Sequence, residues 1–298
     1  MRTETVDPRF VEVDNWPTVS AVEAMLEGQL AAIAAIQGQT QAIAAAADAG
    51  ALRLKAGGRL VYAGAGTSGR IAVQDGVELY PTYNWPHEKL VFLMAGGMGA
   101  LTESEEGAED DAPAARAAIA EHRVGANDVL IGVAASGRTP FTVAAIQAAR
   151  DAGALTIGIA NNPAAILLTA AEHGVLADTG SEIVAGSTRM KAGTAQKAVL
   201  NMLSTAMMLR CGLVYQGLMV NMRISNEKLL DRGRRMVADI AGVDADQAAA
   251  ALEVAKNDIK AAILVALGVS PADAQALLAK GDLRSAIAAR RTGELPNA

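Results

Sequence analysis

Cysteine, aromatic residues and clustered histidines are scarce in this chain of 298 residues. Cys211 is the only cysteine, which excludes a disulfide within the chain and favours a reducing compartment, the cytoplasm. Aromatic residues make up 3% of the chain and the net charge is −6, so we expect no nucleic-acid partner. The three histidines lack the spacing of metal ligands, and we therefore expect no metal.

A signal pattern and a long apolar run are also lacking. The N-terminus does not show the charged and then apolar order of a signal peptide. The most apolar helical stretch, from Ala198 to Leu209, is too short to span a bilayer, so we expect a buried core helix and no membrane partner. The chain is 51% hydrophobic and 19% charged, which is typical of a globular protein with a full core.

The pattern of apolar residues divides the chain into three regions. The pattern predicts an N-terminal helical segment for residues 1–56 and alternating strands and helices, the sheet region, for residues 57–220. For residues 221–298 it predicts helices, with a small bundle from about Ala241. Short apolar strands with helical crossovers predict an α/β fold, a doubly wound parallel sheet covered on both faces. The expected strands are Leu60–Ala63, Leu90–Met94, Val129–Val133, Thr156–Ile159 and Gly174–Ala177.

A Ser-Gly-Arg tripeptide occurs twice, at 68–70 and 136–138, each time just after an expected strand. A strand followed by a Gly/Ser/Thr loop and a helix builds an anion site, because free N–H groups and the helix dipole favour negative charge there. Both turns fall at the carboxyl edge of the sheet and carry hydroxyl groups, which predicts a ligand such as a sugar phosphate. The candidate phosphate-binding residues are Gly66, Thr67, Ser68, Ser136, Gly137, Arg138 and Thr139.

A third entry from loop to helix begins at Gly186 and opens a helix that runs to about Arg210. It adds Ser187, Thr188 and Lys191 to the candidate binding residues. Each serine could be a plain helix cap, and each arginine a salt bridge on the rim of the sheet. The first turn also has Gly-x-Gly-x-x-Gly spacing, but no acidic residue closes the next strand, which favours a phosphosugar over a dinucleotide.

Carboxylates are the remaining candidates for proton transfer. Glu78 lies near the C-terminal end of the first crossover helix, and Glu109 lies in an acidic run that could also be a solvated helix face. Removing a proton from a carbon beside a carbonyl needs a positioned carboxylate or histidine, and the histidines are poorly placed. Neither serine lies in a Gly-x-Ser-x-Gly sequence, so a serine nucleophile is disfavoured.

Several of these segments resemble the N-acetylmuramic acid 6-phosphate etherase family, and the resemblance covers most of the chain from about Gly58. The segments are Gly64–Arg70, Glu78 with Pro81–Tyr83, Glu106–Asp110, Ala134–Pro140, Gly186–Lys197, Asn201–Thr205 and Asn226–Leu229. Their shared order and spacing make the resemblance specific.

The resemblance implies a sugar isomerase (SIS) fold for residues 57–220, followed by a helical region similar to ubiquitin-associated domains. It implies cleavage of the ether between the sugar C3 oxygen and D-lactate, a step of peptidoglycan recycling, by a homodimer without metal or organic cofactor. Glu78 matches the family's proton donor, and Glu109 matches its second active-site glutamate. Two alternatives of the same fold remain, a phosphosugar sensor without catalysis and an aldose–ketose isomerase.

Overall fold

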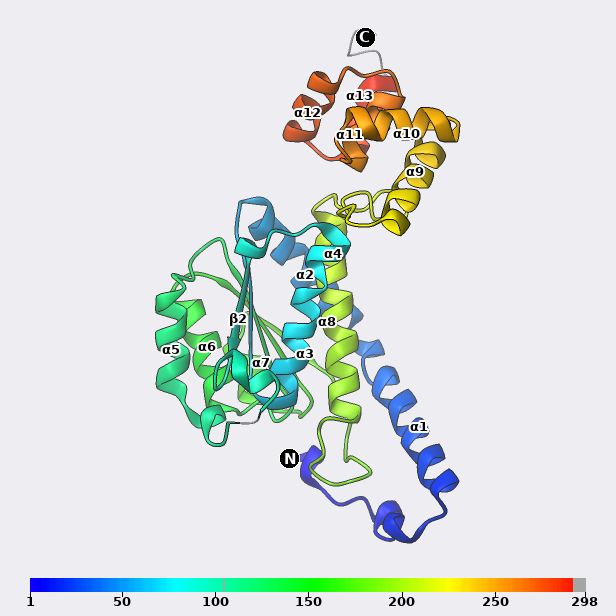
Figure 1. Cartoon of the computed structure of the whole chain (residues 1–298). Coiled ribbons are helices and arrows are strands. Elements are labelled where there is room, and N and C mark those ends of the chain that lie inside the picture. The colour runs from blue at the N-terminus through cyan, green and yellow to red at the C-terminus, as the bar shows by residue number, and fades with distance from the viewer. Residues whose placement is uncertain (104, 292–298) are drawn as a thin grey trace. The chain divides into compact units, whose positions relative to one another are not determined.

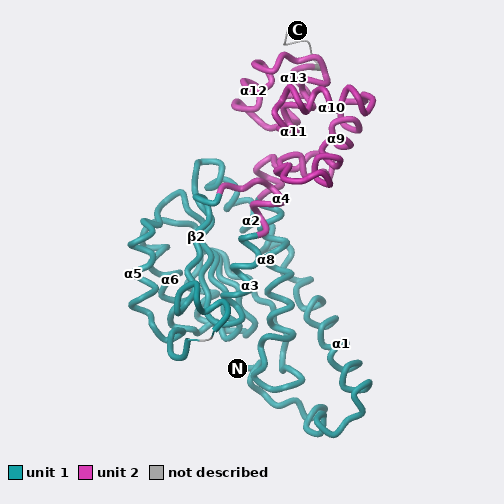
Figure 2. Tube along the Cα trace, viewed as in Figure 1, with its two compact units in different colours: residues 1–77, 87–207 teal, residues 78–86, 208–298 magenta. Residues whose placement is uncertain are grey.

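The computed structural model describes residues 1–103 and 105–291 (Figure 1). The chain forms two compact units (Figure 2). Residues 1–77 and 87–207 form the first, which we call the sheet unit. Residues 78–86 and the chain from residue 208 onward form the second, the helical unit.

The sheet has five parallel strands in the order β2-β1-β3-β4-β5. The strands are β1 (Leu60–Gly64), β2 (Leu90–Met94), β3 (Val129–Ala134), β4 (Leu155–Ala160) and β5 (His173–Leu176). Each overlaps its expected position, and the predicted doubly wound parallel sheet is confirmed. β1, β3 and β4 are buried along their whole length, which explains why they read as continuous apolar runs.

Helices cover both faces of the sheet (Figure 1). One face carries α5 (Ala112–Glu121), α6 (Pro140–Asp151) and α7 (Ile166–Ala170); the other carries α2 (Thr40–Lys55), α3 (Gly66–Val77) and α8 (Lys191–Arg210). Three short 3-10 turns follow or precede β2: η5 (His87–Lys89), η6 (Met98–Leu101) and η7 (Ala108–Asp110). In α8, Leu200, Leu203 and Met207 are fully buried, which confirms the predicted core helix.

The N-terminal region does not form a core of its own. Three 3-10 turns, η1 (Arg2–Glu4), η2 (Pro8–Phe10) and η3 (Val13–Asn15), lead into α1 (Thr18–Ala34), and η4 (Gln37–Gln39) separates α1 from α2. Among the described residues of α1, only Ala32 is buried. Five of its large apolar residues are 49–65% exposed: Val19, Val22, Leu26, Leu30 and Ile33. The segment is helical, but these side chains do not pack into the described core.

The helical unit has a separate apolar core built around Leu252, Ile263 and Leu264. Its helices are α4 (Leu79–Tyr83), α9 (Glu227–Ala241), α10 (Ala245–Val254), α11 (Ile259–Ala266), α12 (Pro271–Lys280) and α13 (Leu283–Arg291). Side chains of Asn226, Asp244, Asp258 and Ser270 cap the starts of α9 to α12. These caps satisfy N–H groups that short helices leave open.

Candidate active site

The two predicted turns lie side by side at the carboxyl edge of the sheet. β1 and β3 are neighbours, with Gly64 paired to Val133, and α3 and α6 begin just beyond them. The strand order changes direction at this pair, and ligands of doubly wound sheets bind at such a point. A cleft of about 560 Å³ opens there, within the size range of small-molecule sites.

The cleft gathers most of the candidate residues of the sheet unit. Those that line it are Gly66, Thr67, Ser68, Glu109, Ser136, Arg138, Thr139 and Thr188. They come from the starts of α3, α6 and α8 and from η7, segments far apart in the sequence. Met1, Glu4 and Asp110 line it as well.

The first turn presents the start of α3 to the cleft. Gly66 has a φ of +51°, a left-handed conformation that suits glycine. The N–H of Gly69 donates to the carbonyl of Ala65 at 3.1 Å and begins the helical ladder. The N–H groups ahead of it are those that a helix leaves without an internal acceptor. This end of α3 is therefore suited to an anion.

The second turn places two hydroxyl groups at the start of α6. The hydroxyl of Ser136 accepts a bond of 3.1 Å from the N–H of Arg138 and lies 3.5 Å from the hydroxyl of Thr139. Gly137 has a φ of +62°, and a Cβ there would lie 2.3 Å from that of Ala165. Only glycine allows this closely packed turn, although Gly137 itself is not among the residues that line the cleft.

The acidic run divides into residues with different surroundings. Asp111 caps α5 by accepting from the N–H of Ala114 at 2.8 Å. Glu109 lies in η7, is exposed, and lines the cleft. Glu78 belongs to the helical unit, where it directly precedes α4 and is exposed.

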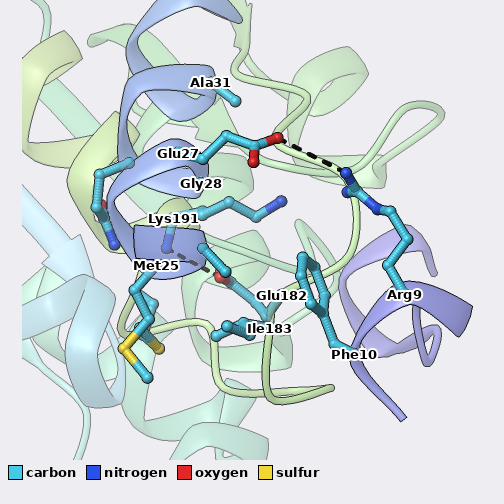
Figure 3. Close-up of a pocket in the computed structure, with 12 residues that line it drawn as sticks. Arg9, Phe10, Met25, Glu27, Gly28, Ala31, Glu182, Ile183 and Lys191 are labelled. Carbon is cyan, nitrogen blue, oxygen red and sulfur yellow. Dashed lines mark hydrogen bonds and ion pairs between the residues drawn. The ribbon is translucent and has the colours of Figure 1, made fainter. Parts of the chain in front are cut away.

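Lys191 lines a second, smaller pocket between α1 and the start of α8 (Figure 3). Its ammonium group donates to the carbonyl of Thr179 at 2.9 Å, and its N–H donates to the carboxylate of Glu182 at 3.0 Å. Arg9 and Glu27 form an ion pair of 3.7 Å at the same pocket. Ser187 precedes α8, and its N–H donates to the carbonyl of Val184 at 2.9 Å.

Sequence reasoning missed two features of this edge. Glu4 enters the cleft from the N-terminal segment, and no local pattern indicated it. Asn162, in a polar pair directly after buried β4, donates to the carbonyl of Ala135 at 2.9 Å. A polar pair at a strand end was a usable signal. Arg70, the arginine of the first Ser-Gly-Arg, donates to the carbonyls of Ala100 and Leu101 and so binds the turn after β2.

A polar network around the buried side chains of Tyr62 and Asp75 joins β1, α3 and α8 beneath the site. The hydroxyl of Tyr62 donates to the carboxylate of Asp75 at 3.1 Å, and the side chain of Asn201 donates to its other oxygen at 2.6 Å. Burial raises the pKa of Asp75, although these hydrogen bonds act in the opposite direction. The network fixes α3, which carries the first turn, to its neighbours.

Comparisons with known proteins agree with this geometry. Residues 40–150 match the model of the glucokinase regulatory protein N-terminal SIS domain, and residues 113–206 match the SIS domain. A structure described as a phosphosugar isomerase involved in capsule formation, from Bacteroides fragilis, superposes with a TM-score of 0.51 at 21% identity, over 67% of this chain and 95% of that one. That likeness supports the fold.

Three relatives named N-acetylmuramic acid 6-phosphate etherase match almost the whole chain. The protein of Deinococcus radiodurans is 48% identical, over 92% of this chain and 90% of its own length. The protein of Streptomyces coelicolor is 47% identical, over 97% of this chain and 94% of its own length. The protein of Rubrobacter xylanophilus is 44% identical, over 96% of this chain and 95% of its own length.

The parallel sheet with polar turns at its carboxyl edge defines a protein of the SIS class. Within that class, the chain belongs to the N-acetylmuramic acid 6-phosphate etherase family.

Proposed function

We propose that this protein cleaves the D-lactyl ether of N-acetylmuramic acid 6-phosphate and releases N-acetylglucosamine 6-phosphate and D-lactate. The observation that carries the proposal is the identity of 44–48%, over more than nine-tenths of the chain, to relatives of that name. The cleft at the ends of β1 and β3 supports it, since it combines polar turns with a carboxylate. The single, half-buried Cys211 is compatible with a cytoplasmic enzyme.

The phosphate group binds, in this proposal, at the starts of α3 and α6. Thr67, Ser68, Ser136 and Thr139 supply hydroxyl donors there, and Arg138 and Thr188 line the same cleft. Two helix starts and their N–H groups favour a dianion without a large positive surface. Gly66 and Gly137 provide the tight turns, while Ser187 and Lys191 support the start of α8 beside the cleft.

The reaction proceeds through the open-chain aldehyde of the sugar, whose C2 proton is acidic because C2 lies beside the C1 carbonyl. A carboxylate removes this proton, the electron pair forms the C2–C3 double bond, and the C3–oxygen bond breaks. The lactate oxygen takes a proton as it leaves, which gives an α,β-unsaturated aldehyde. Water then adds its oxygen to C3, and a proton returns to C2.

Glu109 and Glu78 are the groups that move protons in this scheme. We assign protonation of the leaving lactate to Glu78, from its match to the family's proton donor, and the second acid–base role to Glu109. Glu109 lines the cleft of the sheet unit. Each such group typically contributes about a hundredfold to ten-thousandfold in rate.

Isotope labelling tests the route. In deuterium oxide enriched in oxygen-18, we expect N-acetylglucosamine 6-phosphate with deuterium at C2 and the heavy oxygen at C3, and lactate with no heavy oxygen. Heavy oxygen in the lactate hydroxyl, with the C2 proton retained, would instead show direct displacement at the lactyl carbon. Fructose 6-phosphate, incubated in parallel, should remain unchanged, since interconversion would indicate an isomerase.

We further propose that the protein is a homodimer whose copies meet through α1. The exposed stripe Val19, Val22, Leu26, Leu30 and Ile33 has spacings that are symmetric about Leu26. Two antiparallel copies of α1 that cross at Leu26 therefore set Val22 against the partner's Leu30, as a two-fold interface requires. A helix with so little buried surface needs such a partner for stability.

Light scattering on the eluted protein tests the dimer. We expect twice the chain mass of 30.5 kDa for the wild type and a single chain mass for Leu26→Glu. Leu52→Glu on α2, 69% exposed and outside the stripe, is the control and should stay dimeric.

Residues 18–55 are also apolar enough, by length and composition, to cross a membrane. The dimer would be contradicted if the wild type were a monomer that binds lipid vesicles and the Leu26→Glu variant did not bind them.

A further inference from the structure

We propose that Glu4 is a substrate-binding carboxylate of this cleft, which accepts hydrogen bonds from hydroxyl or amide N–H groups of the sugar. The inference rests on the proposed function, because it assigns a contact to the sugar bound there. It comes from the N-terminal strap, which we define as residues 1–7. Glu4 lines the same cleft as Glu109, Ser136 and Thr188 although it lies far from them in the sequence.

Thr3 fixes the strap at the residue next to Glu4. It is completely buried, and the side-chain amide of Asn162 donates to its hydroxyl at 3.0 Å. The N–H of Thr3 donates to the side-chain oxygen of Asn162 at 3.4 Å, and its carbonyl accepts from the N–H of Gly186 at 3.0 Å. Three hydrogen bonds to two separate loops hold the backbone at Thr3 and thereby fix the position of the neighbouring Glu4.

Both flanks of this anchor are tied as well. Arg2 forms an ion pair with Asp178, and the hydroxyl of Ser181 donates to the carboxylate of Asp7 at 3.3 Å. Hydrogen bonds from Arg9 lower the pKa of Asp7 to about 2, so this carboxylate stays charged at any ordinary pH. The strap is therefore held on the sheet unit on both sides of Glu4.

The anchor is also connected to the phosphate turn. The amide of Asn162 that bonds Thr3 also donates to the carbonyl of Ala135 at 2.9 Å, one residue before Ser136. On the other side, Gly186 leaves room for the carboxylate of Glu4, because a Cβ at Gly186 would lie 2.9 Å from its Oε2. One buried amide thus sets the position of the strap relative to the second turn.

The charge of Glu4 decides what it can bind. A carboxylate repels a phosphate dianion, so its partners in the cleft must be neutral donors. Hydroxyl and amide N–H groups donate to a carboxylate in hydrogen bonds about twice as strong as neutral ones. Glu4 therefore distinguishes a hydroxylated sugar phosphate from a bare phosphate, whereas the turns at α3 and α6 hold the phosphate of both.

Calorimetric titration of the full chain tests this with two probes, N-acetylglucosamine 6-phosphate and inorganic phosphate. For Glu4→Ala we expect the Kd of the sugar phosphate to rise about 10-fold to 100-fold, the range for a lost hydrogen bond to a charged group. The Kd of inorganic phosphate should stay within about twofold or fall, because a like charge is removed. Glu4→Gln keeps an accepting oxygen, so its Kd for the sugar phosphate should lie between the values for the wild type and for Glu4→Ala. Glu12→Ala, exposed on the same N-terminal region, is the control and should match the wild type.

Each other outcome overturns the proposal. Equal weakening of both probes by Glu4→Ala would show that the strap only supports the fold of the cleft. Unchanged binding of both would show that Glu4 does not touch the sugar. If the wild type binds neither probe, the cleft is not the phosphosugar site, and the proposed function fails together with this inference.

Discussion

Gly69 lies directly against Gly64, so that a Cβ added to Gly64 would lie 2.8 Å from the Cα of Gly69. This contact joins the last residue of β1 to the first turn of α3. It leaves no space for a side chain at either position, because a Cβ on Gly69 would lie 2.8 Å from the backbone carbonyl carbon and oxygen of Gly64. The first phosphate turn is therefore shaped by backbone packed against backbone.

Gly64→Ala should disturb this turn, since the atoms it meets are backbone and cannot rotate away. We expect a loss of about 1–3 kcal/mol in the free energy of unfolding, the usual cost of overpacking. Affinity for inorganic phosphate should fall with it. Denaturant unfolding and calorimetry measure the two effects. Gly38→Ala is the control, because a Cβ there meets no described atom within 4 Å.

Glu109→Gln should lower lactate release by at least about a hundredfold, because it removes an acid–base group. Glu78→Gln should do the same, but the two variants should differ in exchange of the C2 proton with deuterium oxide. The variant that still exchanges this proton without releasing lactate has lost the leaving-group acid. Glu106→Gln, an exposed residue of the same acidic run, is the control and should release lactate normally. Normal release by Glu109→Gln would remove it from the mechanism.

Asp75 should make stability fall as the pH rises. Burial raises its pKa above the ordinary value of 3.8, so the folded state holds the proton more tightly than the unfolded state does. Its stabilising contribution is complete below pH 3.8 and is lost as the pH rises through the folded pKa. In Asp75→Asn this decline should be absent. Denaturant unfolding of both proteins across this pH range measures it, and parallel curves would contradict the buried ionisation.

Asp128 should act in the opposite direction. Burial favours its neutral form, but hydrogen bonds from Arg59 and the N–H of Gly125 outweigh burial and lower its pKa. The ion pair with Arg59 measures 2.7 Å. Its contribution is present above pH 3.8 and is lost as the pH falls through the lowered folded pKa. Asp128→Asn should therefore unfold more easily at neutral pH, with a smaller difference from the wild type in acid.

The sequence predicted the parts of the site that are local. Apolar runs located the strands, and the repeated Ser-Gly-Arg placed two turns at one edge of the sheet, because parallel strands end on the same side. Glu4 could not be predicted in this way, since Thr3 and Asn162 are 159 positions apart and only the fold joins them. The apolar pattern indicated helices in residues 1–56, but it did not indicate that Leu26 and Leu30 would be exposed in this chain.

Gly186 offers a last test of the strap, because it touches the carboxylate of Glu4. It has a φ of +76°, so Gly186→Ala introduces backbone strain of about 1–2 kcal/mol as well as a methyl group 2.9 Å from that carboxylate. Gly180→Ala is the matched control, because Gly180 has a φ of +67° and a Cβ there meets no described atom within 4 Å. Both variants should lose similar stability, but only Gly186→Ala should weaken binding of N-acetylglucosamine 6-phosphate. When Gly186→Ala is combined with Glu4→Ala, the affinity for this sugar phosphate should fall little further, since both changes act on one contact. Full additivity of the two losses would show that Gly186 acts on the sugar by another route.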